Sequence, residues 1–193
     1  MQSIAKMWIR LVRAAPGLLA DRRGLAAVEF AFILPVMMVM LFGTVEFSSA
    51  IAIDRKVTLM ARTLSDLTSQ ATTVASSDLT NFFAAATGIM TPYPTTTLSS
   101  TITELYIDPS TLKAKVEWSQ GSAPLTIGSF VTVPSTLAVA GTYLIFSQVS
   151  YTYVPTVGYV LAKTGITMSD SAFTRPRQST CVYYPTAGSS CPI

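Results

Sequence analysis

The sequence predicts an α+β protein in which one long N-terminal helix crosses a membrane and then packs on a roughly four-stranded antiparallel sheet. Three observations predict this fold. Residues 30–45 contain no charged side chain. A helical apolar stripe continues beyond them. The second half of the chain is a series of β-branched and aromatic segments separated by turns.

Charged side chains are unevenly distributed along the 193 residues and make up only 12% of them. Five of the thirteen lysines and arginines precede the apolar run: Lys6, Arg10, Arg13, Arg22 and Arg23. Because the positive flank of a membrane helix stays in the cytoplasm, we expect the N-terminus inside and residues from about 54 outside. The outer part is nearly neutral, which argues against a nucleic-acid-binding face.

Residues 1–24 form the predicted basic leader in the cytoplasm. Its apolar residues, Trp8 among them, recur at helical spacing, and its lysine and arginines up to Arg13 lie off that stripe. This pattern is typical of a short amphipathic helix at a membrane surface. A disordered tail is the alternative that the sequence leaves open.

Residues 25–53 are predicted to form the transmembrane helix. About twenty residues at ~1.5 Å rise cover the roughly 30 Å of a bilayer core. A cleaved signal peptide is the alternative, because residues 48–50 (Ser-Ser-Ala) resemble a cleavage site. We favour the anchor, since the apolar region is longer than that of a usual signal peptide and Glu46 lies close to the cut.

The helix is expected to continue outside the membrane over residues 54–76. No glycine or proline interrupts this segment. Its apolar residues recur along one stripe: Ile53, Val57, Met60, Leu64 and Leu67. The stripe needs an apolar partner, and we expect one face of the sheet to cover it.

Residues 77–193 form the predicted outer α+β domain, which begins with a short helix over 78–86. The strands are predicted at 101–107, 112–118, 143–153 and 166–173. The long connection from Gly121 to Gly141 is expected to run over the sheet.

The second predicted strand alternates strictly between apolar and polar residues. Its apolar positions are Leu112, Ala114, Val116 and Trp118. Because successive side chains of a strand point to opposite faces, we expect all four on one face.

The two cysteines, Cys181 and Cys191, both belong to the outer domain. We expect a disulfide between them, because an oxidising compartment permits one and the loop is short. Such a bond contributes ~2–3 kcal/mol by loop entropy. Two free thiols are the alternative.

Most catalytic chemistry finds no support in the composition. The chain has no histidine, so it has no histidine base, triad or metal ligand. It has no glycine-rich phosphate loop, and its acidic residues outside the membrane are scattered without metal-ligand spacing. We therefore predict that the protein is not an enzyme and that it binds no metal or cofactor.

Glu29 and Pro35 are the unusual residues of the apolar helix. A carboxylate in a membrane helix costs about 2.5–3.5 kcal/mol at the centre and less near the interface, so it usually has a partner. Arg22 is one candidate, and a free amino group created by cleavage just upstream is another. Snorkelling toward the cytoplasm is the alternative for Glu29. We expect Pro35 to kink or loosen the helix.

The segment 24–30 reads GLAAVEF and resembles the processing site of type IV pilin-like proteins. In those proteins a prepilin peptidase cuts after the glycine, and the fifth residue of the mature chain is glutamate. The longer pattern from Arg22 through Leu34-Pro35 to Glu46-Phe47 is similar to the TadE-like family of tight-adherence (Tad/Flp) pilus assembly proteins. A C-terminal pattern, up to Arg177, is similar to the closing strands of that family.

The resemblance implies a pilin-like fold and the role of a minor pseudopilin-like component in Tad pilus assembly, anchored once in the inner membrane with its C-terminal domain in the periplasm. Carried onto this chain, it makes Gly24 the processing site, Leu25 the new N-terminus, and Glu29 the carboxylate that pairs with a neighbour's ammonium group. The implied partners are a prepilin peptidase, a TadF-like pseudopilin, the major Flp pilin and the platform proteins.

Two other classes of function stay open from the sequence alone. One is a membrane-anchored extracytoplasmic binding or adhesion module that is not processed as a pilin. The other is an envelope hydrolase, whose activity would depend on a single Ser or Asp that no spacing in the sequence singles out.

Overall fold

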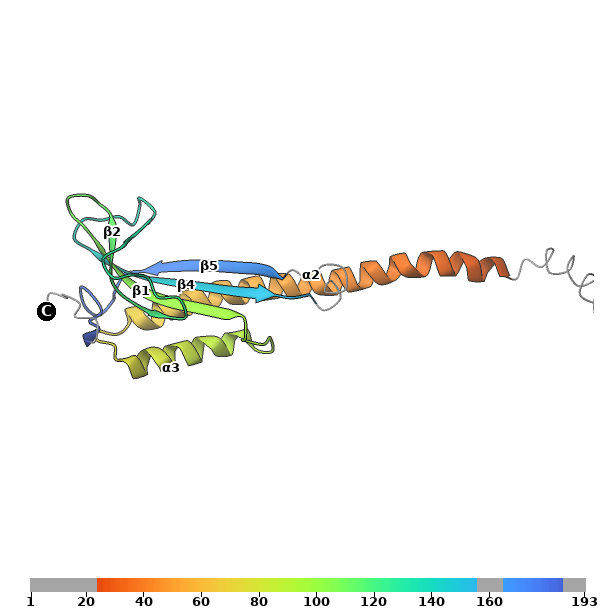
Figure 1. Cartoon of the computed structure of the whole chain (residues 1–193), viewed down its shortest axis with the longest axis horizontal. Coiled ribbons are helices and arrows are strands. Elements are labelled where there is room, and N and C mark those ends of the chain that lie inside the picture. The colour runs from red at the N-terminus through yellow and green to blue at the C-terminus, as the bar shows by residue number, and fades with distance from the viewer. Residues whose placement is uncertain (1–23, 156–164, 186–193) are drawn as a thin grey trace, which may run out of the picture. The chain divides into compact units, whose positions relative to one another are not determined.

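The computed structural model describes residues 24–155 and 165–185. The chain divides into two compact units, Met1–Phe47 and Ser48–Ile193. Helix α2 (Leu25–Ser69) belongs to the first unit up to Phe47 and to the second unit from Ser48 onward. Figure 1 shows α2, the short helix α3 (Ser76–Thr87) and the sheet of the second unit.

Helix α2 is continuous over 45 residues, as the apolar run and the stripe beyond it predict. It ends at Ser69, earlier than the expected residue 76. The hydroxyls of Thr68 and Ser69 bond back to the carbonyls of Leu64 and Asp66, which lets side chains compete with the backbone at this end.

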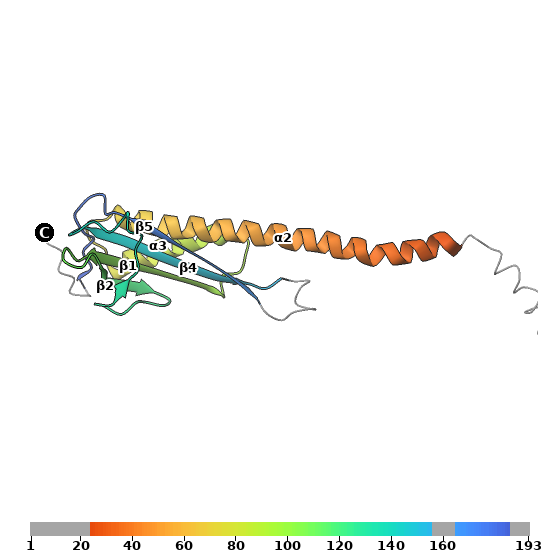
Figure 2. The same cartoon turned by 90° about the horizontal axis from the view of Figure 1, so that it is seen from above.

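The second half of α2 buries its apolar stripe in the core of the second unit. Ile53, Val57, Met60 and Leu64 are all fully buried. They pack against one face of the sheet, which contributes buried residues to the same core: Ile102, Trp118, Ile145, Val149 and Tyr151. Figure 2 shows this part of α2 lying along the sheet. The expected partnership between stripe and sheet is confirmed.

The sheet has five strands in the order β3-β2-β1-β4-β5, and every neighbouring pair is antiparallel. The strands are β1 (Leu98–Ile107), β2 (Ala114–Gly121), β3 (Phe130–Val131), β4 (Tyr143–Tyr153) and β5 (Ile166–Thr174). The predicted number of four was too low, because the two-residue β3 arises inside the connection that was expected to be irregular.

A second apolar cluster lies on the other face of the sheet. It is built from Leu105, Ile107, Ala114, Val116, Leu144 and Phe146. The chain between β2 and β4 lies against this cluster and packs Leu125, Val131, Val133 and Leu137 on it. The connection therefore runs over the sheet as expected, and its apolar residues explain why.

The prediction that β2 keeps one apolar face is wrong. A bulge shifts the register of the β1–β2 pair, so that Leu105 faces Val116 while Glu104 faces Trp118. The extra residue on β2 turns Trp118 to the α2 side, whereas Ala114 and Val116 stay on the other side. Leu112 lies outside the strand, in a turn with a positive φ of 55°, and is exposed.

The segment after β5 returns to the end of α2. The N–H of Arg177 donates to the carbonyl of Ser69, and Tyr183 forms a parallel bridge with Thr73. Cys181 is fully buried in this segment. Cys191 lies outside the described residues, so the disulfide between the two cysteines stays a prediction.

Candidate functional site: the bare half of helix α2

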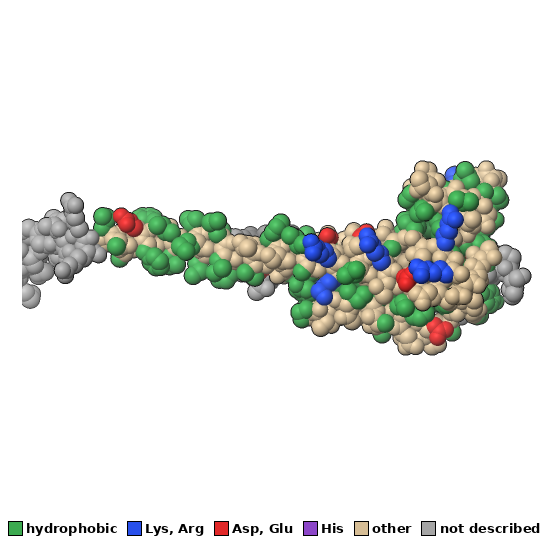
Figure 3. Space-filling model, turned by 180° about the vertical axis from the view of Figure 1, so that it is seen from behind, with side chains coloured by type: hydrophobic (Ala, Val, Ile, Leu, Met, Phe, Trp, Pro, Cys, Tyr) green, Lys and Arg blue, Asp and Glu red, His purple; other side chains and the backbone are tan. Residues whose placement is uncertain are grey.

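Apart from Glu29, the first half of α2 is apolar on all sides, and nothing that the structure describes covers it. Every residue from Gly24 to Val45 is exposed. Phe32, Met37 and Met38 are 77%, 58% and 43% exposed, although they point in three different directions around the helix. Figure 3 shows hydrophobic side chains over the visible face of this segment. A helix on the surface of a soluble protein normally keeps a polar face toward water. The apolar surface of this helix is instead suited to contact with lipid or with neighbouring helices.

Length and composition fit a membrane span. An 18-residue window of α2 has a mean hydropathy of 2.4, and none of it is buried. Within the described residues α2 is the one helix that passes this test. The expected membrane anchor is thus supported by the helix itself, while its orientation stays a prediction.

Gly24, Leu25 and Glu29 lie at the very start of this helix. Leu25 is its first residue, and Glu29 follows four residues later, which places the two side chains on one side of the first turns. Glu29 is exposed and makes no hydrogen bond or ion pair within residues 24–155 and 165–185. Arg22, its expected partner, lies outside the described residues. Glu29 therefore has no partner within the described part of the chain.

Pro35 is accommodated inside α2 without ending it. Its ring removes the backbone N–H that would otherwise donate to the carbonyl of Ala31. Gly43 has open space where a side chain would stand, and the hydroxyl of Thr44 donates back to the carbonyl of Met40 at 2.8 Å. Neither position ends the helix, and the expected kink at Pro35 stays a prediction.

Residues 24–64 match the model of a protein family described as TadE-like protein. The match coincides with the bare half of α2 and the first part of its packed half. We call residues 24–64 the TadE-like segment because of this similarity. No curated protein and no solved structure matches the chain. The resemblance expected from the sequence is confirmed for this segment, and its continuation up to Arg177 stays a prediction.

The outer part of the TadE-like segment is fixed to its unit by polar contacts as well as by the apolar stripe. The hydroxyl of Thr58 donates to Asp170 of β5 at 2.5 Å, and that of Ser147 donates to the carbonyl of Ala61 at 2.6 Å. The ammonium group of Lys56 donates to the carbonyls of Ile89 and Thr91. The second half of α2 is therefore an integral part of the outer fold.

Glu104 is a buried carboxyl group that no motif in the sequence singles out. It lies in the middle of β1, is 1% exposed, and accepts a hydrogen bond from the N–H of Val182 at 2.6 Å. The indole N–H of Trp118 donates to the carbonyl of Val182 at 2.9 Å. Together these two side chains fasten both backbone groups of Val182 to the sheet.

Burial raises the pKa of Glu104 from its usual 4.5 to about 8, even though the N–H of Val182 favours the charged form. The nearby carboxylate of Glu117 also raises it. Glu104 is therefore mostly protonated at neutral pH. Because no metal-binding cluster exists among the described residues and Glu104 contacts the chain's own backbone, we assign it a structural role. The only sequence signal was an acidic residue inside a β-branched segment.

The raised pKa of Glu104 predicts that the outer domain loses stability as the pH rises. The folded chain holds a proton that the unfolded chain releases above pH 4.5, so the free energy of unfolding falls between about pH 4.5 and 8. We expect Glu104→Gln to reduce this slope, because glutamine keeps an acceptor for Val182 without titrating. Urea unfolding of the full chain in micelles across this range measures it.

Asp108→Asn is the matched control for this experiment. Hydrogen bonds from Ser110 and Thr111 lower the pKa of Asp108 to about 2, so it stays ionised throughout the range. Its loss is expected to shift the stability by a constant amount and to leave the slope unchanged. A wild-type slope in Glu104→Gln would contradict the assignment.

Proposed function

We propose that the protein is a membrane-anchored, minor pseudopilin-like component of Tad pilus assembly. The observation that carries this proposal is the coincidence of the TadE-like match with an uncovered apolar helix: residues 24–64 contain both the bare half of α2 and the start of its packed half. A family signature confined to this helix points to the helix as the working part, and TadE-like proteins are associated with pilus assembly.

The bare half of α2 spans the inner membrane, with the leader in the cytoplasm and the outer domain in the periplasm. The basic residues before the helix support this orientation by the positive-inside rule. Because its apolar side chains point in all directions, the helix can contact lipid on one side and a neighbouring membrane helix on another. The outer domain then contributes contacts between subunits outside the membrane.

Glu29 is the proposed assembly carboxylate. It lies near the N-terminal end of α2, where the helix dipole favours a negative charge. After cleavage between Gly24 and Leu25, a new ammonium group would stand one helical turn from it. Pairing with the ammonium group of a neighbouring subunit gives this exposed carboxylate a partner that the described part of its own chain lacks. The proposed partners are therefore a prepilin peptidase, other Tad pseudopilins, the major Flp pilin and the platform proteins.

The periplasm is oxidising, and we propose that Cys181 forms a disulfide with Cys191 there. The short spacing of the two cysteines supports this, because it lets the chain close a small loop. The bond would tie the end of the chain to the segment that Glu104 and Trp118 already fasten to the sheet.

Processing is tested by the intact mass of the protein from cells with and without the prepilin peptidase. We expect a chain that begins at Leu25 in the first strain and the full chain in the second, because residues 24–30 carry the cleavage pattern. Full-length protein in both strains would reject processing at Gly24 and favour an uncleaved anchor.

The role of Glu29 is tested by Glu29→Gln. We expect the variant to insert into the membrane normally but to co-purify with fewer Tad pilins, because a neutral amide cannot pair with an ammonium group. Co-purification and pilus counts measure the effect, and carbonate extraction confirms insertion.

Glu29→Asp is the control, since it keeps the charge on a shorter side chain and should recover much of the association. Normal assembly by Glu29→Gln would rule out the pairing role. That outcome would favour the alternative of an anchored binding module, whose function depends on the outer domain alone.

A further inference from the structure

One end of the outer domain forms a surface beside α2 that is rich in tyrosine and aliphatic residues. Tyr153, at the end of β4, faces Ile166, at the start of β5, and Tyr151 faces Leu98, at the start of β1. Strands β1 and β5 thus begin, and β4 ends, at the same end of the sheet. A hollow of about 460 Å³ opens there between α2 and the strand ends. We call the surface the helix-exit rim and define it by Ser49, Tyr93, Pro94, Tyr153, Val154 and Ile166.

The strand and loop residues of the rim are aromatic, aliphatic or polar but uncharged, and the described charges nearest to it lie on α2. Lys56 reaches the loop before Tyr93, and Glu46 precedes Ser49 by three residues. Val154 is 43% exposed and Ile166 is 52% exposed. No Asp, Glu, Lys or Arg occurs in the described segments that form it, residues 91–103, 148–155 and 165–169. Tyrosine has an apolar ring and a polar hydroxyl, which suits the boundary between water and lipid rather than either phase alone.

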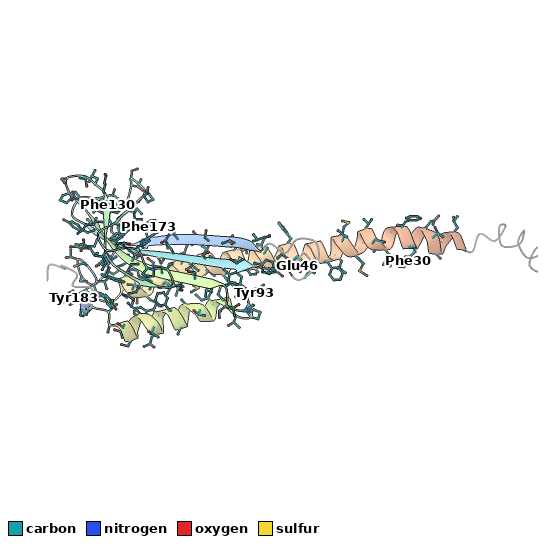
Figure 4. The ribbon with its side chains drawn as sticks, viewed as in Figure 1. Phe30, Glu46, Tyr93, Phe130, Phe173 and Tyr183 are labelled. Carbon is teal, nitrogen blue, oxygen red and sulfur yellow. The ribbon has the colours of Figure 1, made fainter. Side chains whose placement is uncertain are left out.

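Internal hydrogen bonds hold the rim in shape. Lys56 on α2 donates to the carbonyl of Ile89 at 2.7 Å and to that of Thr91 at 2.9 Å, which ties the loop before Tyr93 to the helix. The hydroxyl of Thr97 donates to the carbonyl of Thr152 at 2.8 Å. Figure 4 shows Tyr93 in this loop. The backbone groups in these contacts are satisfied within the protein, so they do not compete for water.

Because α2 is continuous, the position of the rim along the helix can be compared with the end of the apolar segment. Ser49 lines the hollow, and it follows Phe47, the last residue of the bare apolar unit, by only two positions in one unbroken helix. Two residues correspond to about 3 Å along a helix axis. If residues up to Phe47 are embedded in lipid, Ser49 and the side chains around it are at headgroup depth.

We propose that the helix-exit rim rests on the lipid headgroup layer of the membrane that α2 crosses. This inference rests on the proposed membrane anchor and adds a second contact with the bilayer, made by the folded domain. Its exposed aliphatic residues enter the interfacial layer, together with the exposed parts of the half-buried Tyr93 and Tyr153, because Tyr is enriched there in membrane proteins.

Depth-dependent fluorescence quenching tests this contact. The full chain is reconstituted in phosphatidylcholine–phosphatidylglycerol vesicles that carry a doxyl quencher near the headgroup, and one tryptophan is added as Val154→Trp or, independently, as Ile166→Trp. We expect roughly twofold quenching of the added fluorescence at either rim position, because interfacial aromatic rings lie at headgroup level.

Phe130→Trp is the matched control. Phe130 is 62% exposed on β3, the strand at the sheet edge opposite β5, and Phe to Trp is a conservative change. We expect its added fluorescence to be unaffected by the quencher. Equal quenching at Val154, Ile166 and Phe130 in chains that float with the vesicles would overturn the rim contact alone. Chains that fail to float would overturn the membrane anchor and the rim contact with it.

Discussion

The structure depends on the burial of one helical stripe against one face of a sheet. Ile53, Val57, Met60 and Leu64 are completely removed from solvent where α2 crosses the strands. Burying a side chain of this size contributes about 1.5–3 kcal/mol relative to leaving it exposed. The other contacts of α2 depend on this burial, because the hydroxyls of Thr58 and Ser147 and the ammonium group of Lys56 reach their partners only when the helix lies on the sheet.

The same helix serves two environments because its side chains change along its length. Up to Val45, apart from Glu29, it is apolar in every direction and exposed. Beyond Ser48 the apolar residues narrow to a stripe, while Arg55 and Arg62 on the exposed side face water. The TadE-like match covers both parts of the helix, since it runs from Gly24 to Leu64.

Periodicity predicted the helix, its stripe and the main strands, since these are local patterns. It missed β3 and the bulge on β2, which arise from pairing between strands. It also missed Glu104, because the residue's partner Val182 is 78 positions away. At the candidate site, the pattern from Gly24 to Glu29 was visible in the sequence, and the structure adds its exposure. Neither identifies the partner of Glu29, since no described residue of the chain fills that place.

The most direct measurement of the central claim compares two leucines of one helix that differ in burial. Leu64 is fully buried in the stripe, whereas Leu59 is 52% exposed. In urea unfolding of the full chain in micelles, followed by Trp118 fluorescence, Leu64→Ala should lose about 2–5 kcal/mol of the free energy of unfolding. Leu59→Ala should change it by about 0.5 kcal/mol at most. Equal losses for the two variants would contradict the account, because the stripe would then not be what joins the helix to the sheet.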